Sequence, residues 1–279
     1  MSHRIAGFPN LSATRRLAAC ALMAGIAMLA AGCSTLPRGA QAWSSSQQLV
    51  LVTTADWDAN QATLQTFDRT AGGWRPVMPA TAVTVGRSGL AWGTGLHPAQ
   101  PGPVKREGDG RAPAGVFHIG TAFGYGASGA TALPYQAMQA SDYCIDVNAS
   151  PLYNRIVDAN VVGQAAIEGS TEPMRRDIHA GGDQRYQLGF VIEHNAANVP
   201  AAGSCIFAHV WKMPGEPTAG CTAMDAAVMT QLLGWLRPDR QPVFVLLPQA
   251  QYARLQAAWG LPVIAPTKSP RHAANSQPD

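Results

Sequence analysis

The sequence predicts a mainly β (α+β) domain, a mixed and mostly antiparallel β-sandwich or β-roll with a few helices at its edges. Three observations predict this class. Short apolar and β-branched runs recur along the chain, and Gly, Pro and Asn mark turns between them. Only two segments near the C-terminus have the apolar spacing of a helix. The chain has 279 residues, which is enough for one such core after a leader is removed.

Residues 1–32 are expected to be an export signal and not part of the fold. Arg4, Arg15 and Arg16 form a basic start, and an apolar run follows over residues 17–29. This run is too short, and wrongly flanked, for a membrane span. The three arginines leave with the signal, so the formal charge of +3 falls to about zero in the mature chain. A nucleic-acid partner, which requires a basic face, is therefore not expected.

Small residues lead directly into Cys33. They resemble a bacterial lipobox, although Ala30 stands where leucine is usual. The resemblance implies lipidation of Cys33 and attachment to the membrane through that lipid only. Ser34 follows, and no aspartate does, which implies an outer-membrane-anchored lipoprotein of the periplasm or cell envelope. A plain signal peptide with cleavage nearby is the alternative.

The mature chain divides into a tether, one domain and a tail. Residues 33–47 are polar and resemble a flexible tether, residues 48–261 form the domain, and residues 262–279 are rich in Pro, Ser and Asn and are expected to be disordered. Long Gly/Pro/Ala-rich connections at 92–113 and 120–134 are expected to line a site. In chain order the predicted strands are Leu49–Thr53, Ala62–Phe67, Ala82–Val85, Val116–Ile119, Tyr143–Val147, Leu188–Glu193, Cys205–Val210 and Val243–Leu247.

Two helices are predicted after these strands. Thr222 and Asp225 have the spacing of a capping box, so the first helix is expected to begin just after Cys221. Its apolar face comprises Met229, Leu232, Leu233 and Leu236, and Pro238 ends it. The second helix is predicted over Gln249–Trp259, before Gly260.

Three cysteines remain after the leader and Cys33 are set aside. An odd number of thiols in an oxidising compartment suggests one disulfide and one free cysteine. Cys221 has the surroundings of a reactive thiol, so Cys144 and Cys205 are the expected disulfide pair. The alternative is that both are buried free thiols.

The segment from Cys205 to Met224 is the most informative part of the chain. His209 ends an apolar run, and Cys221 follows within Thr-Ala-Gly-Cys-Thr. A thiol at the start of a helix, with an imidazole nearby, is expected to be held as a thiolate and to attack an acyl carbon. His209 is the expected acid–base partner. The Gly220 and Cys221 N–H groups are the expected oxyanion donors.

Other residues of this segment have supporting roles. Thr218 is expected to shape the loop or to hydrogen-bond near the thiol, and Thr222 to belong to the same loop. For His179 and His194 a structural role is expected. Four basic residues are expected to be solvated surface charges, and binding of substrate carboxylates is the weaker alternative for each: Lys105, Arg106, Arg175 and Arg176.

At these residues the chain resembles the L,D-transpeptidase catalytic domain family. His209, Thr218, Gly220 and Cys221 match that family's histidine and Ser/Thr-x-Gly-Cys motif, and Lys105–Phe117 resembles another of its segments. Val210 and Ala223 depart from it, where many members have glycine and arginine. The resemblance implies the family's fold and, as substrates, peptidoglycan stem peptides. Cys221 would take the acyl group, release D-Ala and pass the acyl group to an amine, without metal or organic cofactor, and a monomer is expected.

Three other functions stay open. Water in place of an amine would make the protein an L,D-carboxypeptidase. The same fold without catalysis would make it a cell-wall-binding lipoprotein. A metal site formed by His209, Cys221, Cys205 and His179 is the third, although the spacing matches no standard zinc pattern.

Overall fold

The computed structural model describes residues 42–264, so the predicted leader, Cys33, the first part of the tether and most of the tail lie outside the described residues. The described region is mainly β, with 33% strand and 15% helix. Within it, no helix is long and apolar enough to cross a membrane.

The main sheet closes on itself as a mixed β-barrel. Its strands follow the order β1, β14, β6, β11, β12, β13, β4, β2, and the path closes because β2 also pairs with β1. Most pairs are antiparallel, whereas β1–β14 and β12–β13 are parallel. The predicted mainly β, mostly antiparallel class is thus confirmed. The barrel strands are β1 (Gln48–Thr54), β2 (Gln61–Thr70), β4 (Thr81–Thr84), β6 (Ala112–Gly124), β11 (Leu188–Ile192), β12 (Phe207–Val210), β13 (Thr222–Met224) and β14 (Val243–Pro248).

Short strands extend this sheet at its margins. β3 (Gly73–Pro76) pairs with β2, and β5 (Leu90–Trp92) and β7 (Tyr135–Ala137) pair with β6. The barrel strands supply most of the main core. Strands such as β1 and β14 are buried along their whole length. Such continuous burial explains why these strands are apolar runs and do not alternate.

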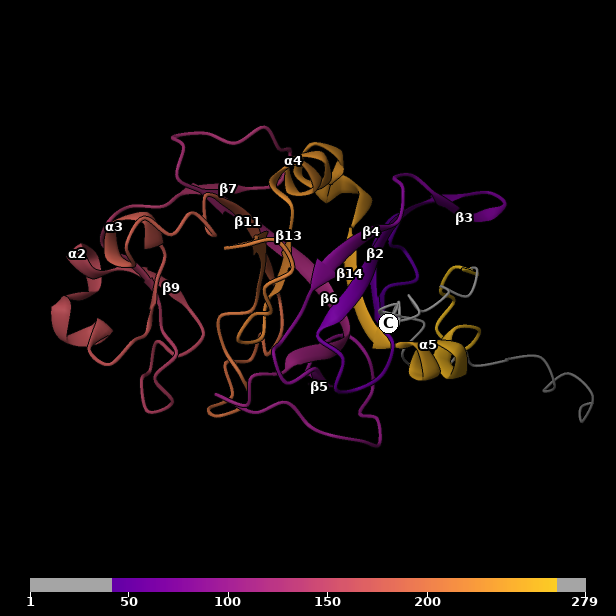
Figure 1. Cartoon of the computed structure of the whole chain (residues 1–279), viewed down its shortest axis with the longest axis horizontal. Helices are drawn as coiled ribbons and strands as arrows, with labels where there is room; N and C mark the ends of the chain where they lie inside the picture. The colour runs from indigo at the N-terminus through magenta and orange to yellow at the C-terminus, as the bar shows by residue number, and fades with distance from the viewer. Residues whose placement is uncertain (1–41, 265–279) are drawn as a thin grey trace, which may run out of the picture. The chain divides into compact units, whose positions relative to one another are not determined.

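Two helices cover the barrel (Figure 1). α4 (Ala226–Trp235) contacts β11 and β12, and α5 (Gln249–Leu255) contacts β14 and β1. The predicted apolar face of α4 is confirmed, since Met229, Leu232 and Leu233 are buried. Asp225 caps the helix through a 2.8 Å bond from the Ala227 N–H.

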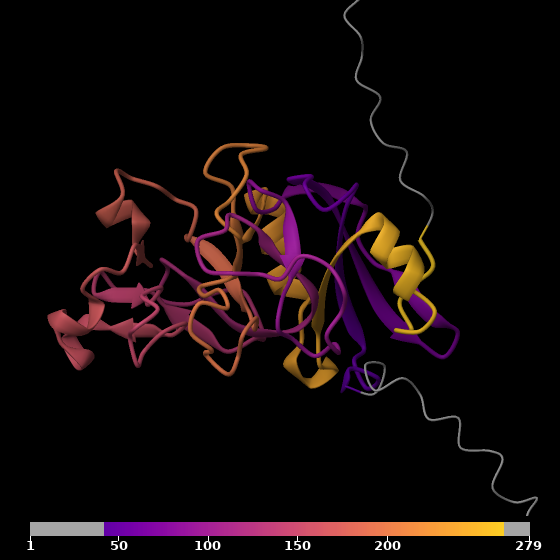
Figure 2. The ribbon, with the colours of Figure 1, turned by 90° about the horizontal axis from the view of Figure 1, so that it is seen from below.

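A smaller lobe holds the remaining elements. It contains a three-stranded sheet in the order β10, β8, β9, and it lies at the end of the barrel remote from α5 (Figures 1 and 2). The disulfide Cys144–Cys205 joins this lobe to the segment before β12 and confirms the predicted pair. The lobe comprises β8 (Asp142–Cys144), β9 (Ile156–Asp158), α2 (Ala159–Val162), η1 (Gln164–Ile167), β10 (Glu172–Pro173) and α3 (Arg176–His179); a further short turn, η2 (Pro238–Arg240), precedes β14.

Two predicted boundaries need correction. Trp43 is 2% exposed and its indole N–H donates to the Trp259 carbonyl, so the predicted tether ends before residue 43. The helix predicted over Gln249–Trp259 is regular only as far as Leu255, and turns continue to Gly260. Gly260 has a φ of +62°, a left-handed conformation that favours glycine at a helix end.

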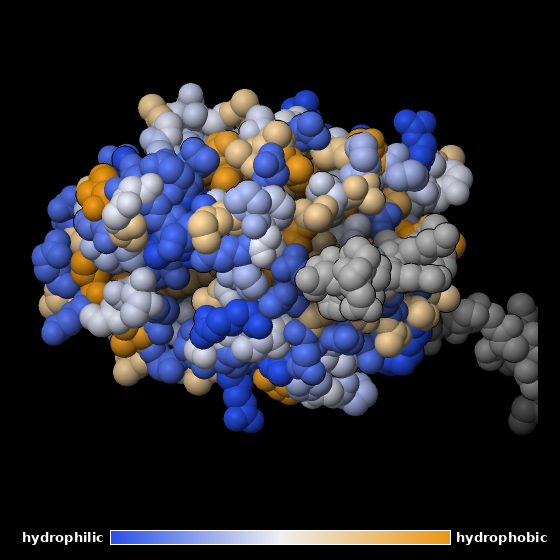
Figure 3. All heavy atoms as spheres, viewed as in Figure 1, coloured by the Kyte–Doolittle hydropathy of each residue, from blue (hydrophilic) through white to orange (hydrophobic). Residues whose placement is uncertain are grey.

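Large exposed apolar side chains are spread over the described surface. Val161 lies on α2, Ile178 on α3 and Met213 in the loop after β12. The face shown in Figure 3 accordingly has small apolar groups between hydrophilic ones.

Candidate active site around Cys221

Cys221 is the one free cysteine among the described residues, and it is 8% exposed. It lies directly before β13, and α4 begins only at Ala226. The prediction that Cys221 opens a helix is therefore wrong. Thr222–Met224 is a strand between β12 and β4, and Asp225, the predicted end of a capping box, is itself the N-cap. Within residues 42–264, no helix N-terminus lies at the sulfur to favour a thiolate.

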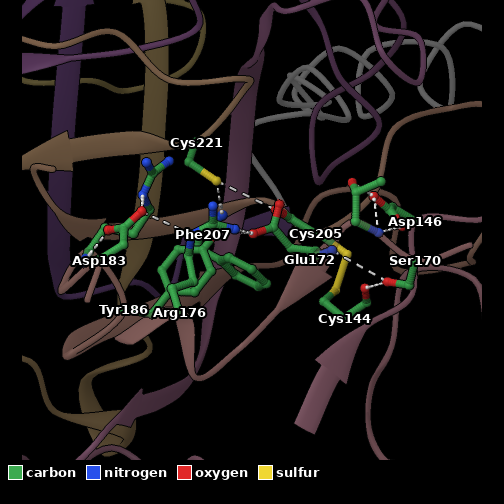
Figure 4. Close-up of polar contacts among 12 residues, drawn as sticks. Cys144, Asp146, Ser170, Glu172, Arg176, Asp183, Tyr186, Cys205, Phe207 and Cys221 are labelled. Carbon is green, nitrogen blue, oxygen red and sulfur yellow. Dashed lines mark hydrogen bonds and ion pairs between the residues drawn. A yellow bond between two sulfur atoms is a disulfide. The ribbon is translucent and has the colours of Figure 1, made fainter. Parts of the chain in front are cut away.

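Backbone groups hold the sulfur from two sides. The Phe207 N–H donates to Cys221 Sγ at 3.3 Å, and the thiol donates to the Cys205 carbonyl at 3.5 Å (Figure 4). Cys205 has a φ of +55°, which takes it out of the extended conformation, so the strand predicted from residue 205 begins at Phe207. The disulfide thus fixes the residue whose carbonyl meets the thiol.

The thiol is neutral at pH 7. Burial raises the pKa of Cys221 to about 12, the charge of Glu172 adds to this, and the Phe207 N–H and the charges of Arg185 and Lys105 oppose it. This contradicts the sequence-based expectation of a stable thiolate, which rested on a helix N-terminus that is absent. A proton must leave the sulfur before it can act as a nucleophile.

His209 lies on β12 and is buried. Its Nδ1 lies 2.7 Å from the Val210 carbonyl, and because a carbonyl only accepts, Nδ1 carries the proton and Nε2 is left with a lone pair. A backbone carbonyl is thus the orienting group that the sequence did not identify. Burial lowers the pKa of His209 to about 4, the Val210 bond opposes this, and the charge of Arg185 lowers the pKa further. The imidazole is neutral at pH 7.

Strand register relates His209 to Cys221. His209 pairs with Ala223 across the parallel β12–β13 ladder, and Cys221 lies two residues before Ala223, directly ahead of β13. Tyr186 packs edge-on against His209 with the ring centroids 5.2 Å apart. Among the described residues, no hydrogen bond joins His209 to Cys221.

Cys221 and His209 line different cavities. Cys221 and Gly220 border one of about 180 Å³, whereas His209 borders a much smaller one with Arg185 and Thr218. The cavity around Cys221 is bordered by charged residues from three parts of the chain: Arg87, Lys105, Glu107, Asp146 and Glu172. The predicted loop 92–113 supplies part of this wall, as expected. A larger cavity, of about 400 Å³, contains neither Cys221 nor His209.

Thr218 and Gly220 form a tight turn that presents Cys221. The Thr218 hydroxyl donates to the Cys221 carbonyl at 2.6 Å and accepts the Gly220 N–H at 3.1 Å. The Gly220 N–H is therefore occupied, which leaves Cys221 as the candidate among the two predicted oxyanion donors. A Cβ at Gly220 would lie 3.0 Å from the Arg111 carbonyl, which explains the glycine. Thr222 is buried in β13.

Three of the four remaining basic candidates form ion pairs with acidic side chains: Lys105, Arg175 and Arg176. Lys105 is buried and contacts Asp109 at 2.6 Å, and Arg175 contacts Asp177 at 2.7 Å. Arg176 contacts Glu172, and for Arg106 the structure records only backbone bonds, with Asp109 and Lys105. Lys105 alone of these four borders the Cys221 cavity.

The two other candidate histidines, His179 and His194, make structural contacts. The alternative metal site is excluded because one of its four suggested ligands is not a free thiol. His194 bonds to Thr94 and Ala202, and His179 bonds to the Ala140 carbonyl. Cys205 lies in the disulfide and has no thiolate to offer. Within residues 42–264, no group of three or more His, Cys, Asp or Glu side chains is arranged to hold a metal ion.

Sequence reasoning missed Glu172 and Tyr186. Tyr186 contacts His209 and Phe207 with its ring, and its hydroxyl donates to Glu172 at 2.7 Å. Neither residue is near Cys221 in the chain, so no local spacing could have revealed the group.

No protein family, curated protein or solved structure was found to match this chain.

Proposed function

We propose that the protein is a cysteine acyltransferase in which Cys221 is the nucleophile. The observation that carries the proposal is the position of its sulfur, which is free, receives a backbone N–H and borders a cavity with a charged wall. Cavities with a few placed polar groups are the usual sites of small ligands and short peptides. The other two cysteines of the described region are used in the disulfide.

A neutral thiol and a neutral imidazole suit general-base activation. His209 Nε2 accepts the thiol proton as sulfur attacks an amide carbonyl, and later gives that proton to the leaving amine. The Phe207 N–H stabilises the negative charge that develops on sulfur. Because no hydrogen bond joins His209 to the thiol among the described residues, substrate binding must bring the two side chains into hydrogen-bonding distance for this transfer. The Cys221 N–H is the proposed oxyanion donor.

The proposed substrates are peptidoglycan stem peptides, on the L,D-transpeptidase type of fold. This assignment rests on the ordered resemblance of Lys105–Phe117, His209 and Thr218–Cys221 to that family. The acyl group would pass to an amine, with release of D-Ala, in the periplasm or cell envelope, from a lipoprotein anchored through Cys33. The Cys221 cavity has both cationic and anionic residues on its wall, which suits the charged ends of such peptides.

Two alternatives remain. An L,D-carboxypeptidase would use the same residues with water as acceptor. A non-catalytic cell-wall-binding lipoprotein is favoured by two observations, the pKa of about 12 for Cys221 and the lack of a bond between Cys221 and His209.

Release of D-Ala separates these functions. Mature protein is incubated with a tetrapeptide stem, with and without an acceptor amine, and D-Ala and peptide products are quantified. The proposal predicts D-Ala release and a cross-linked product, both abolished in Cys221→Ala and reduced about 100-fold or more in His209→Gln. Release without cross-linking identifies the carboxypeptidase. No release by the wild type, together with binding of the stem, identifies the binding protein.

A further inference from the structure

Glu172 is the acidic residue that the disulfide brings to the Cys221 cavity. It lies on β10 directly opposite Cys144 of β8, and Cys144 is bonded to Cys205, whose carbonyl meets the thiol. Glu172 and Cys221 border the same cavity. Figure 4 shows the Glu172 carboxylate near Phe207 and Cys205, the two residues that hold the sulfur.

The two oxygens of Glu172 have different surroundings. Oε1 accepts the Tyr186 hydroxyl at 2.7 Å and the Arg176 guanidinium at 3.1 Å. Within residues 42–264, no donor binds Oε2. The side chain keeps 22% of its surface exposed. One oxygen is thus anchored, while the other is available to a ligand in the cavity.

The other two acidic residues of the cavity wall are occupied differently. Glu107 accepts the hydroxyls of Tyr153 and Ser204 with the same oxygen. Asp146 accepts the Thr171 N–H and hydroxyl and ties two lobe segments together. The charge of Glu172 acts on the Cys221 thiol and helps to raise its pKa.

We propose that Glu172 binds the incoming acceptor amine and takes its proton when the amine attacks the Cys221 thioester. This inference rests on the proposed function and deepens it, because it names the group that selects an amine over water. A carboxylate attracts an ammonium group, whereas water has no charge to attract. Arg176 and Tyr186 hold the carboxylate in place as positioning residues.

The step balances without a further reactant. The bound ammonium group first releases one proton to water, which frees the nitrogen lone pair. The amine nitrogen then forms a bond to the acyl carbon, and the C–S bond breaks with its electron pair passing to Cys221 sulfur. The nitrogen loses a second proton to Glu172 Oε2, and Glu172 then returns that proton to the sulfur. The products are an amide, the free thiol, the original carboxylate and the proton released to water.

Glu172→Gln tests this inference, because it keeps the size of the side chain and an oxygen for Tyr186 and Arg176. Glu168→Gln is the matched control, because Glu168 is an exposed acidic residue of the same lobe that does not border the cavity. For each variant the Cys221 acyl adduct formed from a tetrapeptide stem is followed by intact mass. Its decay is then measured in water alone and with an acceptor amine. Circular dichroism and thermal melting establish that each variant is folded, and Glu172→Asp replaces Glu172→Gln if the latter does not fold.

Glu172→Gln is expected to form the adduct at least as fast as the wild type, because it removes a charge that raises the pKa of Cys221. It is expected to slow aminolysis of the adduct about 100-fold, which lowers the ratio of amide to hydrolysis product. Glu168→Gln is expected to retain the wild-type ratio. Glu172→Asp, with its shorter carboxylate, is expected to fall between the wild type and Glu172→Gln. An unchanged ratio in Glu172→Gln, an equal fall in both glutamine variants, or an equal loss of hydrolysis and aminolysis would overturn the role of Glu172 and leave the acyltransferase proposal standing. Absence of any adduct on the wild type would overturn both.

Discussion

Thr218 should be a large contributor to the stability of the turn that presents Cys221. Its buried hydroxyl makes two bonds, one to the Cys221 carbonyl and one from the Gly220 N–H. Thr218→Val has nearly the same shape and removes both bonds, so a buried acceptor and a buried donor lose their partner. A buried polar group without a partner costs about 1–3 kcal/mol. We therefore expect Thr218→Val to lower the free energy of unfolding by about 3 kcal/mol.

The control for Thr218→Val is Thr53→Val. Thr53 is 3% exposed on β1, and its hydroxyl has no hydrogen-bond partner among the described residues. Replacing an unpartnered buried hydroxyl by a methyl group should leave stability unchanged or raise it by about 1 kcal/mol. The two variants make the same chemical change, and only the hydrogen bonds differ.

Urea titration and thermal melting of the oxidised protein at pH 7 measure both effects. For a domain of this size, a loss of 3 kcal/mol corresponds to a fall in Tm of roughly 6–12 °C. The reasoning is refuted if Thr218→Val costs less than about 1 kcal/mol, or if Thr53→Val costs as much as Thr218→Val.

Three further predictions concern charge states and the disulfide. Alkylation of native Cys221 by iodoacetamide should rise continuously from pH 7 to pH 10, because its pKa is about 12; a plateau below pH 8 would contradict this. The His97, His194 and His209 pKa values are lowered to about 4, so the unfolded state binds more protons below pH 6.5. Stability contributed by these histidines is then complete above that pH and is lost as pH falls towards 4. We expect a loss of at least about 2 kcal/mol between pH 7 and pH 5 in urea titrations, and equal stability at both would count against it. Thiol titration of the unreduced, unfolded mature domain, with Cys33 replaced by serine, should find one thiol, and three titratable thiols would contradict the disulfide. The double variant Cys144→Ser with Cys205→Ser should lower the free energy of unfolding by about 4 kcal/mol, because the lost link spans 61 residues.

Local patterns sufficed for most barrel strands. Segments such as Leu49–Thr53 and Val243–Leu247 are apolar and β-branched along their length, and the structure places a strand at each. The disulfide could also be predicted, because it follows from the number of cysteines, the expected oxidising compartment and the reactive surroundings of Cys221. The closure of the sheet could not be predicted from the sequence, since pairing of β1 with both β2 and β14 depends on contacts between segments far apart in the chain.

The candidate site was predicted only where it is local in sequence. Cys221, His209 and Thr218 lie within one short segment and were identified. The start of α4 was misplaced because Thr222 and Asp225 have the spacing of a capping box, whereas pairing with β12 makes Thr222 part of a strand. The predicted thiolate state of Cys221 was also wrong, because burial of the sulfur, which the sequence does not show, raises its pKa. Glu172 was missed because β10 has only two residues, and the disulfide, not chain proximity, brings it to the cavity.

Covalent capture tests the central claim most directly. Mature protein is mixed with a tetrapeptide stem and quenched in acid at short times, and the intact mass and a peptide map are recorded. The account predicts a mass increase equal to the stem without its terminal D-Ala, located on the peptide that contains Cys221 and absent from Cys221→Ala. An unmodified Cys221 throughout turnover, or an equal adduct in Cys221→Ala, would contradict it.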